Sequence, residues 1–322
     1  PTMITQARNR FAPLAKASFA IGDLAELDAL LHDQPPFDLY YNSYGSLSHL
    51  NDDQLRRMIE AVLAHQPGPC ALLIDVHGQL SPEWPVYWGY SRDPAAPRMQ
   101  PYNMVWMYPQ TERAARLEEQ RDYRVRYWRG EELREFLLGI PGLAERQRSL
   151  TLFDRSVLVG RHMDTASFSP GIKPLRRAVN ALFEFNHIST PEDLRAEPLP
   201  ATGDPLADAF FVDYLRAWNA LVDWFDRLLG GIPLLPADLC ASGGPVPARL
   251  QEGMEALIEQ AKRLAWFNPG DPEANLLQPQ FGLLLRQLEF HTQRGLGCGH
   301  GLLAVLELSS AAEPTDVRPS GH

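Results

Sequence analysis

Cysteine is scarce in this sequence of 322 residues, which contains only three. Cys70, Cys240 and Cys298 lie far apart and form no pattern of closely spaced pairs. Small secreted domains that depend on disulfides carry more cysteines at shorter spacings. We therefore expect reduced thiols and a cytoplasmic protein.

Long apolar runs are also missing. No stretch reaches the roughly 18 consecutive apolar residues that a membrane-spanning helix needs, and no apolar segment of the signal-peptide type lies near the start. Hydrophobic residues still make up 45% of the chain, which is enough to bury a sizeable core. The sequence predicts a soluble globular protein with no membrane partner.

Positive charge is in the minority. The chain has 30 lysines and arginines against 40 acidic residues, which gives a formal net charge of −10. Nucleic-acid-binding proteins need a basic surface that neutralises phosphates, so we expect no nucleic-acid partner. A local basic pocket remains compatible with this charge balance, and a small molecule is the expected substrate.

What is present is an alternation of strand-like and helical patterns in the first 80 residues. The strand-like runs cover residues 17–21, 37–42 and 70–76, and the helical patterns cover residues 24–31 and 51–65. Such alternation is typical of a doubly wound α/β sheet. Ligands of these sheets bind at the carboxyl ends of the strands, where polar residues are therefore of interest.

Further along the chain the patterns are mainly helical. Additional strands are expected at residues 123–129 (an exposed strand), 149–159 and 302–308. The expected organisation is an α/β core in residues 1–166, a helical insertion or lid in residues 167–293, a final core strand in residues 294–309 and a disordered tail in residues 310–322. An insertion of this kind is a common place for a substrate lid or a homodimer surface.

Polar or glycine-rich breaks follow the three strand-like runs. They are Gly22-Asp23, the loop from Asn42 to His49, and the segment from Asp75 to Gly78. Asp23 has two interpretations, because it can accept a hydrogen bond from an adenine amino group or simply cap the helix that follows. The loop that starts at Asn42 is either a wall of a cofactor site or an ordinary connection in which His49 is a packing residue.

Two other histidines stand near carboxylates. Asp75 and His77 share one face of a strand, so they suit an acid–base pair, and chain reversal explains them equally well. His162 lies between Arg161 and Asp164, a combination that suits an anionic acceptor or a structural salt bridge.

The glycine-rich run from Gly295 to Gly301 superficially looks like a phosphate-binding loop. Phosphate loops follow a strand and open a helix, whereas this run follows a helix and precedes a strand. We expect a flexible turn into the last strand. Cys298 and His300 lack two further ligands at zinc spacing, so no metal is expected.

Aromatic residues cluster in the middle of the chain. They either line an acceptor pocket, where they can cage a sulfonium by cation–π attraction, or pack as ordinary core and loop residues. They are Tyr102, Trp106, Tyr108, Tyr127 and Trp128.

Three segments, taken in order, carry a resemblance to a known family. They read Ala17-Ser-Phe-Ala-Ile-Gly-Asp23-Leu24, Phe37-Asp-Leu-Tyr-Tyr-Asn42-Ser-Tyr-Gly-Ser-Leu-Ser-His49 and Gly68-Pro-Cys-Ala-Leu-Leu-Ile-Asp75. They are similar to the third, fourth and fifth strands of class I S-adenosylmethionine-dependent methyltransferases, which have a Rossmann-like fold. The runs at residues 149–159 and 302–308 would then be the antiparallel final pair of strands.

The resemblance implies S-adenosylmethionine as the cofactor. Asp23 would contact the adenine, and Asn42 and Ser43 would lie beside the cofactor. The full set of implied cofactor-binding residues is Gly22, Asp23, Leu24, Asn42, Ser43 and Tyr44.

One feature of the family has no counterpart here. The glycine-rich loop after the family's first strand and the acid that ends its second strand do not precede Asp23. The opening Pro1-Thr-Met-Ile-Thr-Gln-Ala-Arg8 resembles the segment that follows the second strand. We therefore expect a fragment or incomplete reading frame whose sheet lacks its first two strands. The alternative is that the third-strand segment pairs directly with the fourth strand.

The implied reaction is methyl transfer to a small molecule by direct in-line displacement, in which an O, N or C nucleophile attacks the cofactor methyl. The candidate bases are His49, His77 and His162. Two other functions stay open, namely a catalytically inactive methyltransferase-like binding module and another Rossmann-like enzyme.

Overall fold

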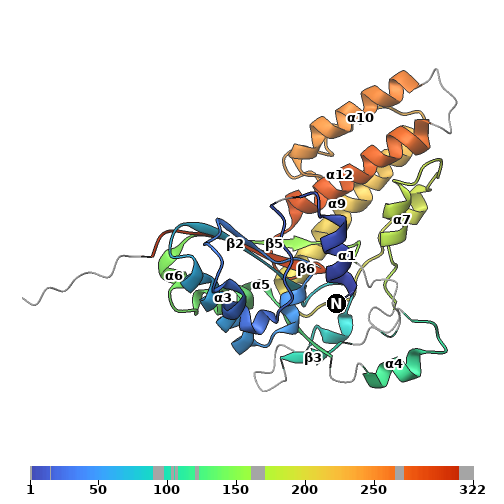
Figure 1. Cartoon of the computed structure of the whole chain (residues 1–322). Helices are drawn as coiled ribbons and strands as arrows, with labels where there is room; N and C mark the ends of the chain where they lie inside the picture. The colour runs from blue at the N-terminus through green and yellow to red at the C-terminus, as the bar shows by residue number, and fades with distance from the viewer. Residues whose placement is uncertain are drawn as a thin grey trace, which may run out of the picture. The chain divides into compact units, whose positions relative to one another are not determined.

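The computed structural model describes residues 2–14, 16–89, 98–102, 105, 108–119, 123–160, 171–264 and 272–311. They form a mixed α/β fold with a six-stranded open sheet, as the sequence predicts at this level (Figure 1). The chain divides into two compact units. Unit 1 consists of Pro1–Asp75, Leu133–Thr151 and Ala304–His322, and unit 2 of Val76–Glu132 and Leu152–Leu303.

The sheet contains parallel and antiparallel neighbours. Its strands are β1 (Leu39–Tyr41), β2 (Cys70–Gly78), β3 (Met99–Pro101), β4 (Arg124–Trp128), β5 (Gln147–Arg155) and β6 (Gly301–Leu308). The order is β3-β4-β2-β6-β5, and β1 pairs with β2 off this path. Strands β1 and β4 are parallel to β2, whereas β3 is antiparallel to β4.

Strands β5 and β6 run antiparallel, as expected for the final pair. In unit 1 the Ser309 N–H donates to the Arg146 carbonyl at 2.7 Å, just beyond one end of the pair. In unit 2 the His300 N–H donates to the Ser156 carbonyl at 3.1 Å, just beyond the other end. Residue numbers increase along β5 while those of the paired residues along β6 decrease, which is the pattern of an antiparallel pair.

Unit 1 contains most of the predicted N-terminal helices. Its helical elements are α1 (Thr2–Arg10), η1 (Leu24–Glu26), α2 (Leu27–Leu31), η2 (Ser46–His49), α3 (Asp52–His65), α6 (Leu143–Arg146) and most of α5 (Gly130–Leu138). Helix α3 begins with a complete capping box between Asn51 and Gln54. Leu55, Ile59 and Val62 recur at helical spacing and are fully buried.

The strand expected at residues 17–21 is not formed. Within the described chain β1 pairs only with β2, so this run has no neighbouring strand to complete its backbone hydrogen bonds. Its Phe19 carbonyl instead accepts a hydrogen bond from Arg8 at 2.8 Å, and Ile21 is 65% exposed. The prediction of a third-strand segment is therefore wrong, and so is the alternative that it pairs with the fourth.

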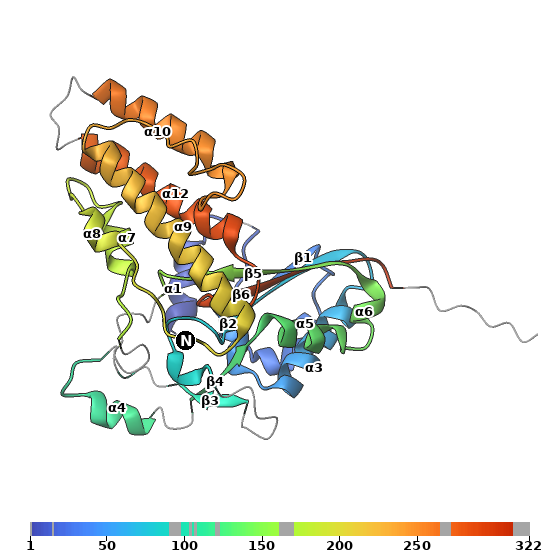
Figure 2. The ribbon, with the colours of Figure 1, turned by 180° about the vertical axis from the view of Figure 1, so that it is seen from behind.

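Unit 2 holds the long helices of the expected insertion. Its helical elements are η3 (Pro85–Tyr87), α4 (Arg113–Glu119), α7 (Arg176–Ala181), α8 (Pro191–Leu194), α9 (Pro205–Leu229), η6 (Ala248–Leu250), α10 (Gln251–Arg263), the π-helical turn η8 (Glu273–Leu277) and α12 (Gln278–Thr292). Helices α9, α10 and α12 lie side by side (Figure 1, Figure 2). The Phe225 and Phe281 rings stack between α9 and α12 with centroids 4.0 Å apart.

Two local expectations for unit 2 have different outcomes. The long helix α9 is confirmed, and Asp204 caps it by accepting the N–H groups of Leu206 and Ala207. Strand β4 is buried at four of its five residues, so the prediction of an exposed strand is wrong. Its alternating sequence was misleading because Arg126 is buried beside the Trp128 ring, with the guanidinium 4.0 Å from the ring centroid. No helix of the described chain is long and apolar enough to cross a membrane.

A buried guanidinium joins several backbone segments of unit 1. Arg146 is 5% exposed. Its Nε donates to the Ser309 carbonyl at 2.9 Å, and its Nη1 to the Leu63 carbonyl at 3.2 Å. Its Nη2 donates to the carbonyls of Gln66 at 2.8 Å and Gly68 at 2.6 Å. The planar fork of an arginine can serve four acceptors at once, which a lysine ammonium cannot do.

We expect Arg146→Lys to lower the free energy of unfolding by about 3 kcal/mol, because buried carbonyls lose their donors. Urea unfolding of the full chain measures this change. Arg148→Lys, two residues along on an exposed side chain, is the matched control and should change stability by less than about 0.5 kcal/mol. Equal effects of the two substitutions would contradict the assigned role of Arg146.

Candidate functional site

The first group of candidate residues follows β1 in unit 1. We call Asn42, Ser43 and Tyr44 the polar loop. The Asp75 N–H donates to Asn42 Oδ1 at 3.2 Å, and the Tyr44 N–H donates to Asp75 Oδ2 at 2.8 Å. β1 pairs in parallel with the first part of β2, with Tyr41 opposite Leu73, so Asp75, two residues further along β2, lies beside the polar loop and holds it in place.

The polar loop makes a sharp, partly strained turn. Tyr44 has φ of +61° and Gly45 has φ of +66°, both in the left-handed region. For a tyrosine this conformation costs of the order of 1 kcal/mol, and it persists only where neighbouring contacts impose it. The turn leaves the Tyr44 side chain 78% exposed, so its ring is available to a ligand.

The second predicted group, Gly22 to Leu24, lies on the surface of unit 1 at the start of η1. Asp23 Oδ1 accepts the Ala25 N–H at 2.9 Å, so the capping interpretation of Asp23 is confirmed. Because residues 17–21 form no strand, these residues do not mark a strand end. No hydrogen bond among the described residues joins this group to the polar loop.

The three candidate histidines are in different parts of the chain. His49 is half-buried at the end of η2 in unit 1, and His77 is 4% exposed at the end of β2 in unit 2. His162, its neighbours Arg161 and Asp164, and Trp106 lie outside the described residues. Their predicted roles therefore stay predictions.

The structure surrounds His77 with groups that the sequence did not connect to it. We call His77, Glu83, Trp84, Tyr127 and His300 the histidine cluster. All five belong to unit 2, and none is more than 6% exposed. The imidazole centroids of His77 and His300 are 5.0 Å apart, and a Glu83 carboxylate oxygen is hydrogen-bonded to His300 Nδ1. The carboxylate that serves the cluster is thus Glu83.

Aromatic rings form the walls of the histidine cluster. The Trp84 and Tyr127 centroids lie 5.5 and 6.0 Å from the His77 centroid, and that of Tyr102 lies 6.2 Å away. Tyr102 and Tyr127 pack together in a hydrophobic core cluster, which agrees with the packing interpretation of these aromatic residues. Tyr108 does not join this wall, because its ring packs under the Arg116 guanidinium.

Hydrogen bonds define which nitrogen of each imidazole holds the proton. His77 Nδ1 faces the His300 carbonyl at 3.3 Å, and a carbonyl only accepts, so Nδ1 is the donor. His300 Nδ1 faces a Glu83 carboxylate oxygen, which accepts when ionised, so Nδ1 is the donor there too. In both neutral rings Nε2 is then the nitrogen that can accept a proton.

The glycine-rich turn that carries His300 is firmly held, which corrects the expectation of a flexible turn. Asp154 Oδ1 accepts the N–H groups of Gly297 and Cys298, and Oδ2 accepts that of Leu296, each at 2.8 Å. Gly297 has φ of +88°, and a Cβ there would lie 2.5 Å from the Trp128 carbonyl oxygen. Glycine is required at this position for both reasons.

Neither the buried cysteine nor a metal explains this turn. Burial raises the pKa of the Cys298 thiol well above its ordinary value, so it remains protonated and is a poor nucleophile or metal ligand. Among the residues that the structure describes, no group of three or more His, Cys, Asp or Glu side chains could hold a metal ion.

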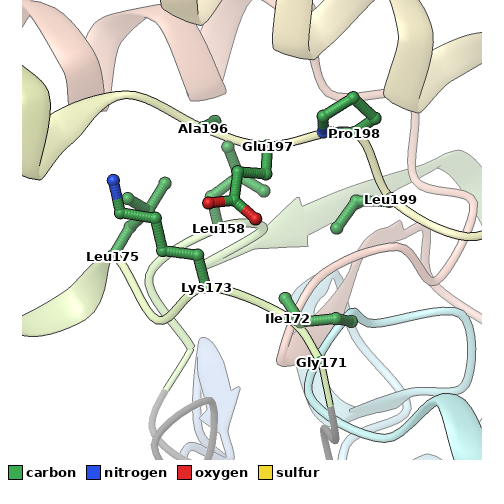
Figure 3. A pocket seen from close by; sticks show the side chains of 9 residues that line it. All are labelled: Leu158, Gly171, Ile172, Lys173, Leu175, Ala196, Glu197, Pro198 and Leu199. Carbon is green, nitrogen blue, oxygen red and sulfur yellow. The ribbon is translucent and has the colours of Figure 1, made fainter.

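A small cavity of unit 2 is too small to be a substrate site. Figure 3 shows it beside Lys173 and Glu197. Its volume of about 10 Å³ accommodates at most about one water molecule. Lys173 Nζ donates to the carbonyls of Glu192 at 2.8 Å and Arg195 at 3.0 Å, so its ammonium has a structural role.

No family model, no curated protein and no solved structure matches this chain.

We expect Asp154→Asn to lower the free energy of unfolding by about 3 kcal/mol, because an amide NH₂ would face backbone donors. Burial is the largest influence on the Asp154 carboxyl and raises its pKa, although backbone N–H groups oppose it. The unfolded carboxyl ionises at about pH 4, so above that pH the folded state binds more protons and its stability falls as pH rises. The advantage of wild type over Asp154→Asn should therefore shrink as the pH rises above about 4.

Denaturant unfolding at several pH values measures this trend. The exposed Asp226→Asn on α9 is the control and should change stability by less than about 0.5 kcal/mol. An advantage of wild type that grows with pH would show that the N–H groups outweigh burial at Asp154.

Proposed function

We propose that this chain takes part in S-adenosylmethionine-dependent methyl transfer to a small-molecule acceptor by in-line displacement. The observation that carries the proposal is the polar loop at the carboxyl end of β1, hydrogen-bonded to Asp75 within the parallel strand β2. Doubly wound sheets bind ligands at such ends. The antiparallel pairing of β5 and β6 agrees with the final pair that the family resemblance implies.

The residues of unit 1 suit part of such a cofactor. Asp23 Oδ2 has no hydrogen-bond partner within the described chain, and an adenine amino group is a donor that it can accept. The exposed ring of Tyr44 offers a π-face to an adenine or a sulfonium. When bound, the cofactor supplies an activated methyl group, so the protein's task is mainly to position the acceptor and exclude water.

The histidine cluster of unit 2 supports a role in proton removal. An acceptor hydroxyl or amine loses a proton as it is methylated, and an imidazole near neutral pKa is the usual base. Within unit 2, His300 hydrogen-bonded to Glu83 has the side-chain chemistry of such a base. His77 remains a candidate through its Nδ1 contact with the His300 carbonyl.

One observation favours the inactive binding module as the second candidate. The implied adenine group, Gly22 to Leu24, lies on the surface and follows no strand, so the polar loop carries most of the expected cofactor contacts. A module that kept the fold but bound no cofactor would look similar in this region. Cofactor binding therefore separates the two candidates.

Calorimetric titration of the full chain with S-adenosylmethionine should give a dissociation constant of roughly micromolar size, about −8 kcal/mol. Tyr44→Gly should weaken binding about tenfold or more by removing the ring, worth at least about 1.4 kcal/mol. Folding should be retained, because glycine adopts the left-handed φ of this position without strain.

Ser156→Gly is the matched control, because Ser156 also has a positive φ of 61° but lies in unit 2. Its binding constant should equal that of wild type. Absence of binding by the wild-type chain would refute the proposal in favour of the binding module. Equal binding by wild type and Tyr44→Gly would show that the polar loop is not part of the cofactor site.

A further inference from the structure

A polar pocket of about 440 Å³ lies in unit 2, and none of its lining residues belongs to the histidine cluster. Its volume is within the range of small-molecule sites. It is formed by one face of α9, the end of α12 and a short loop. The lining residues are Phe210, Asp213, Tyr214, Arg216, Ala217, Gly244, Pro245, His291, Thr292, Gln293 and Arg294.

Two guanidinium groups of the pocket share a single carboxylate. Asp213 lies 3.9 Å from Arg216 and 3.7 Å from Arg294, both longer than a hydrogen bond. Within the described chain neither arginine makes a hydrogen bond through its side chain. The pocket therefore keeps an excess of one positive charge and most of its N–H donors, although the chain as a whole carries −10.

The pocket also has an aromatic side. The Phe210 and Tyr214 rings stack with centroids 5.5 Å apart and an interplanar angle of 11°. Both side chains are almost fully buried, at 1% exposure. The two rings close the inner end of the pocket and expose almost no apolar surface to a ligand, so the two arginines supply most of the recognition.

We propose that this pocket binds a small organic molecule through an anionic group, a phosphate or a carboxylate, held by Arg216 and Arg294. A guanidinium presents two parallel N–H donors that match two oxygens of either anion. Asp213 holds the two arginines near each other and lowers the affinity by competing for them. The inference is independent of the proposed methyl transfer, since it uses no residue of the polar loop or the histidine cluster.

Two anions serve as probes for the full chain. Inorganic phosphate tests the anionic group alone, and benzoate tests a carboxylate joined to a ring. Each is titrated by NMR chemical-shift perturbation at constant ionic strength, with chloride as the reference salt, because screening otherwise mimics weak binding. We expect saturable binding of at least one probe, and the stronger of the two identifies the kind of anion.

Two substitutions move the affinity in opposite directions. The double variant Arg216→Gln/Arg294→Gln should weaken the bound probe about tenfold or more. Asp213→Asn should strengthen it by up to about fivefold, because it removes the competing carboxylate at a half-exposed position. Arg227→Gln, an exposed arginine of α9 that does not line the pocket, is the control and should leave affinity unchanged.

The proposal fails if neither probe gives a saturable chemical-shift change relative to the chloride reference. It also fails if the double variant binds the probe as tightly as wild type. The same holds if Arg227→Gln weakens binding as much as the double variant does, because the loss of affinity would then result from the change in net charge. A misfolded double variant would be recognised by its spectrum, and the gain expected from Asp213→Asn then decides the question.

Discussion

The buried carboxylate of Asp154 determines the shape of the region around the histidine cluster. It accepts three consecutive N–H groups of the glycine-rich turn, which would otherwise be buried without partners. The turn places the His300 ring beside the Glu83 carboxylate and edge-on to the His77 ring. Gly78 allows this approach, because a Cβ there would lie 2.4 Å from the Gly299 carbonyl oxygen. The position of His300 thus depends on hydrogen bonds accepted by Asp154, a residue outside the histidine cluster.

Each unit contains a buried charged residue that makes several hydrogen bonds to backbone groups. In unit 2 it is Asp154, which receives N–H donors, and in unit 1 it is Arg146, which donates to four carbonyls. Isolated charges are costly to bury, and hydrogen bonds from backbone dipoles offset that cost. Both residues also hydrogen-bond to segments that are far apart in the sequence. The relative positions of those segments therefore depend on one side chain in each unit.

Local sequence patterns predict local structure well here. The capping box and apolar stripe predict α3, the continuous apolar run predicts β2, and the aromatic-rich helical pattern predicts α9. The run at residues 17–21 shows the limit of such patterns. Apolar composition indicates burial or pairing but not whether a neighbouring strand exists, and here the described chain offers none.

The candidate site was predictable only in part, for a related reason. Asp75 and the polar loop were recognisable because each directly follows a strand-like run. Glu83 and His300 are 217 residues apart, and no spacing rule connects them. Asp154 gave no signal either, since an aspartate in an alternating strand resembles any solvent-facing residue. The glycine run contained the hint, because glycines at that density are needed where backbones approach closely.

The proposed methyl transfer requires that the polar loop and the cap residue Asp23 face an S-adenosylmethionine-derived ligand. A crystal structure of the full chain with S-adenosylhomocysteine tests it most directly. The account predicts the adenosine against Tyr44, with a hydrogen bond from the adenine amino group to Asp23 or to the polar loop. A structure at saturating ligand with no nucleoside in unit 1, or with the nucleoside held by unit 2 alone, would contradict it.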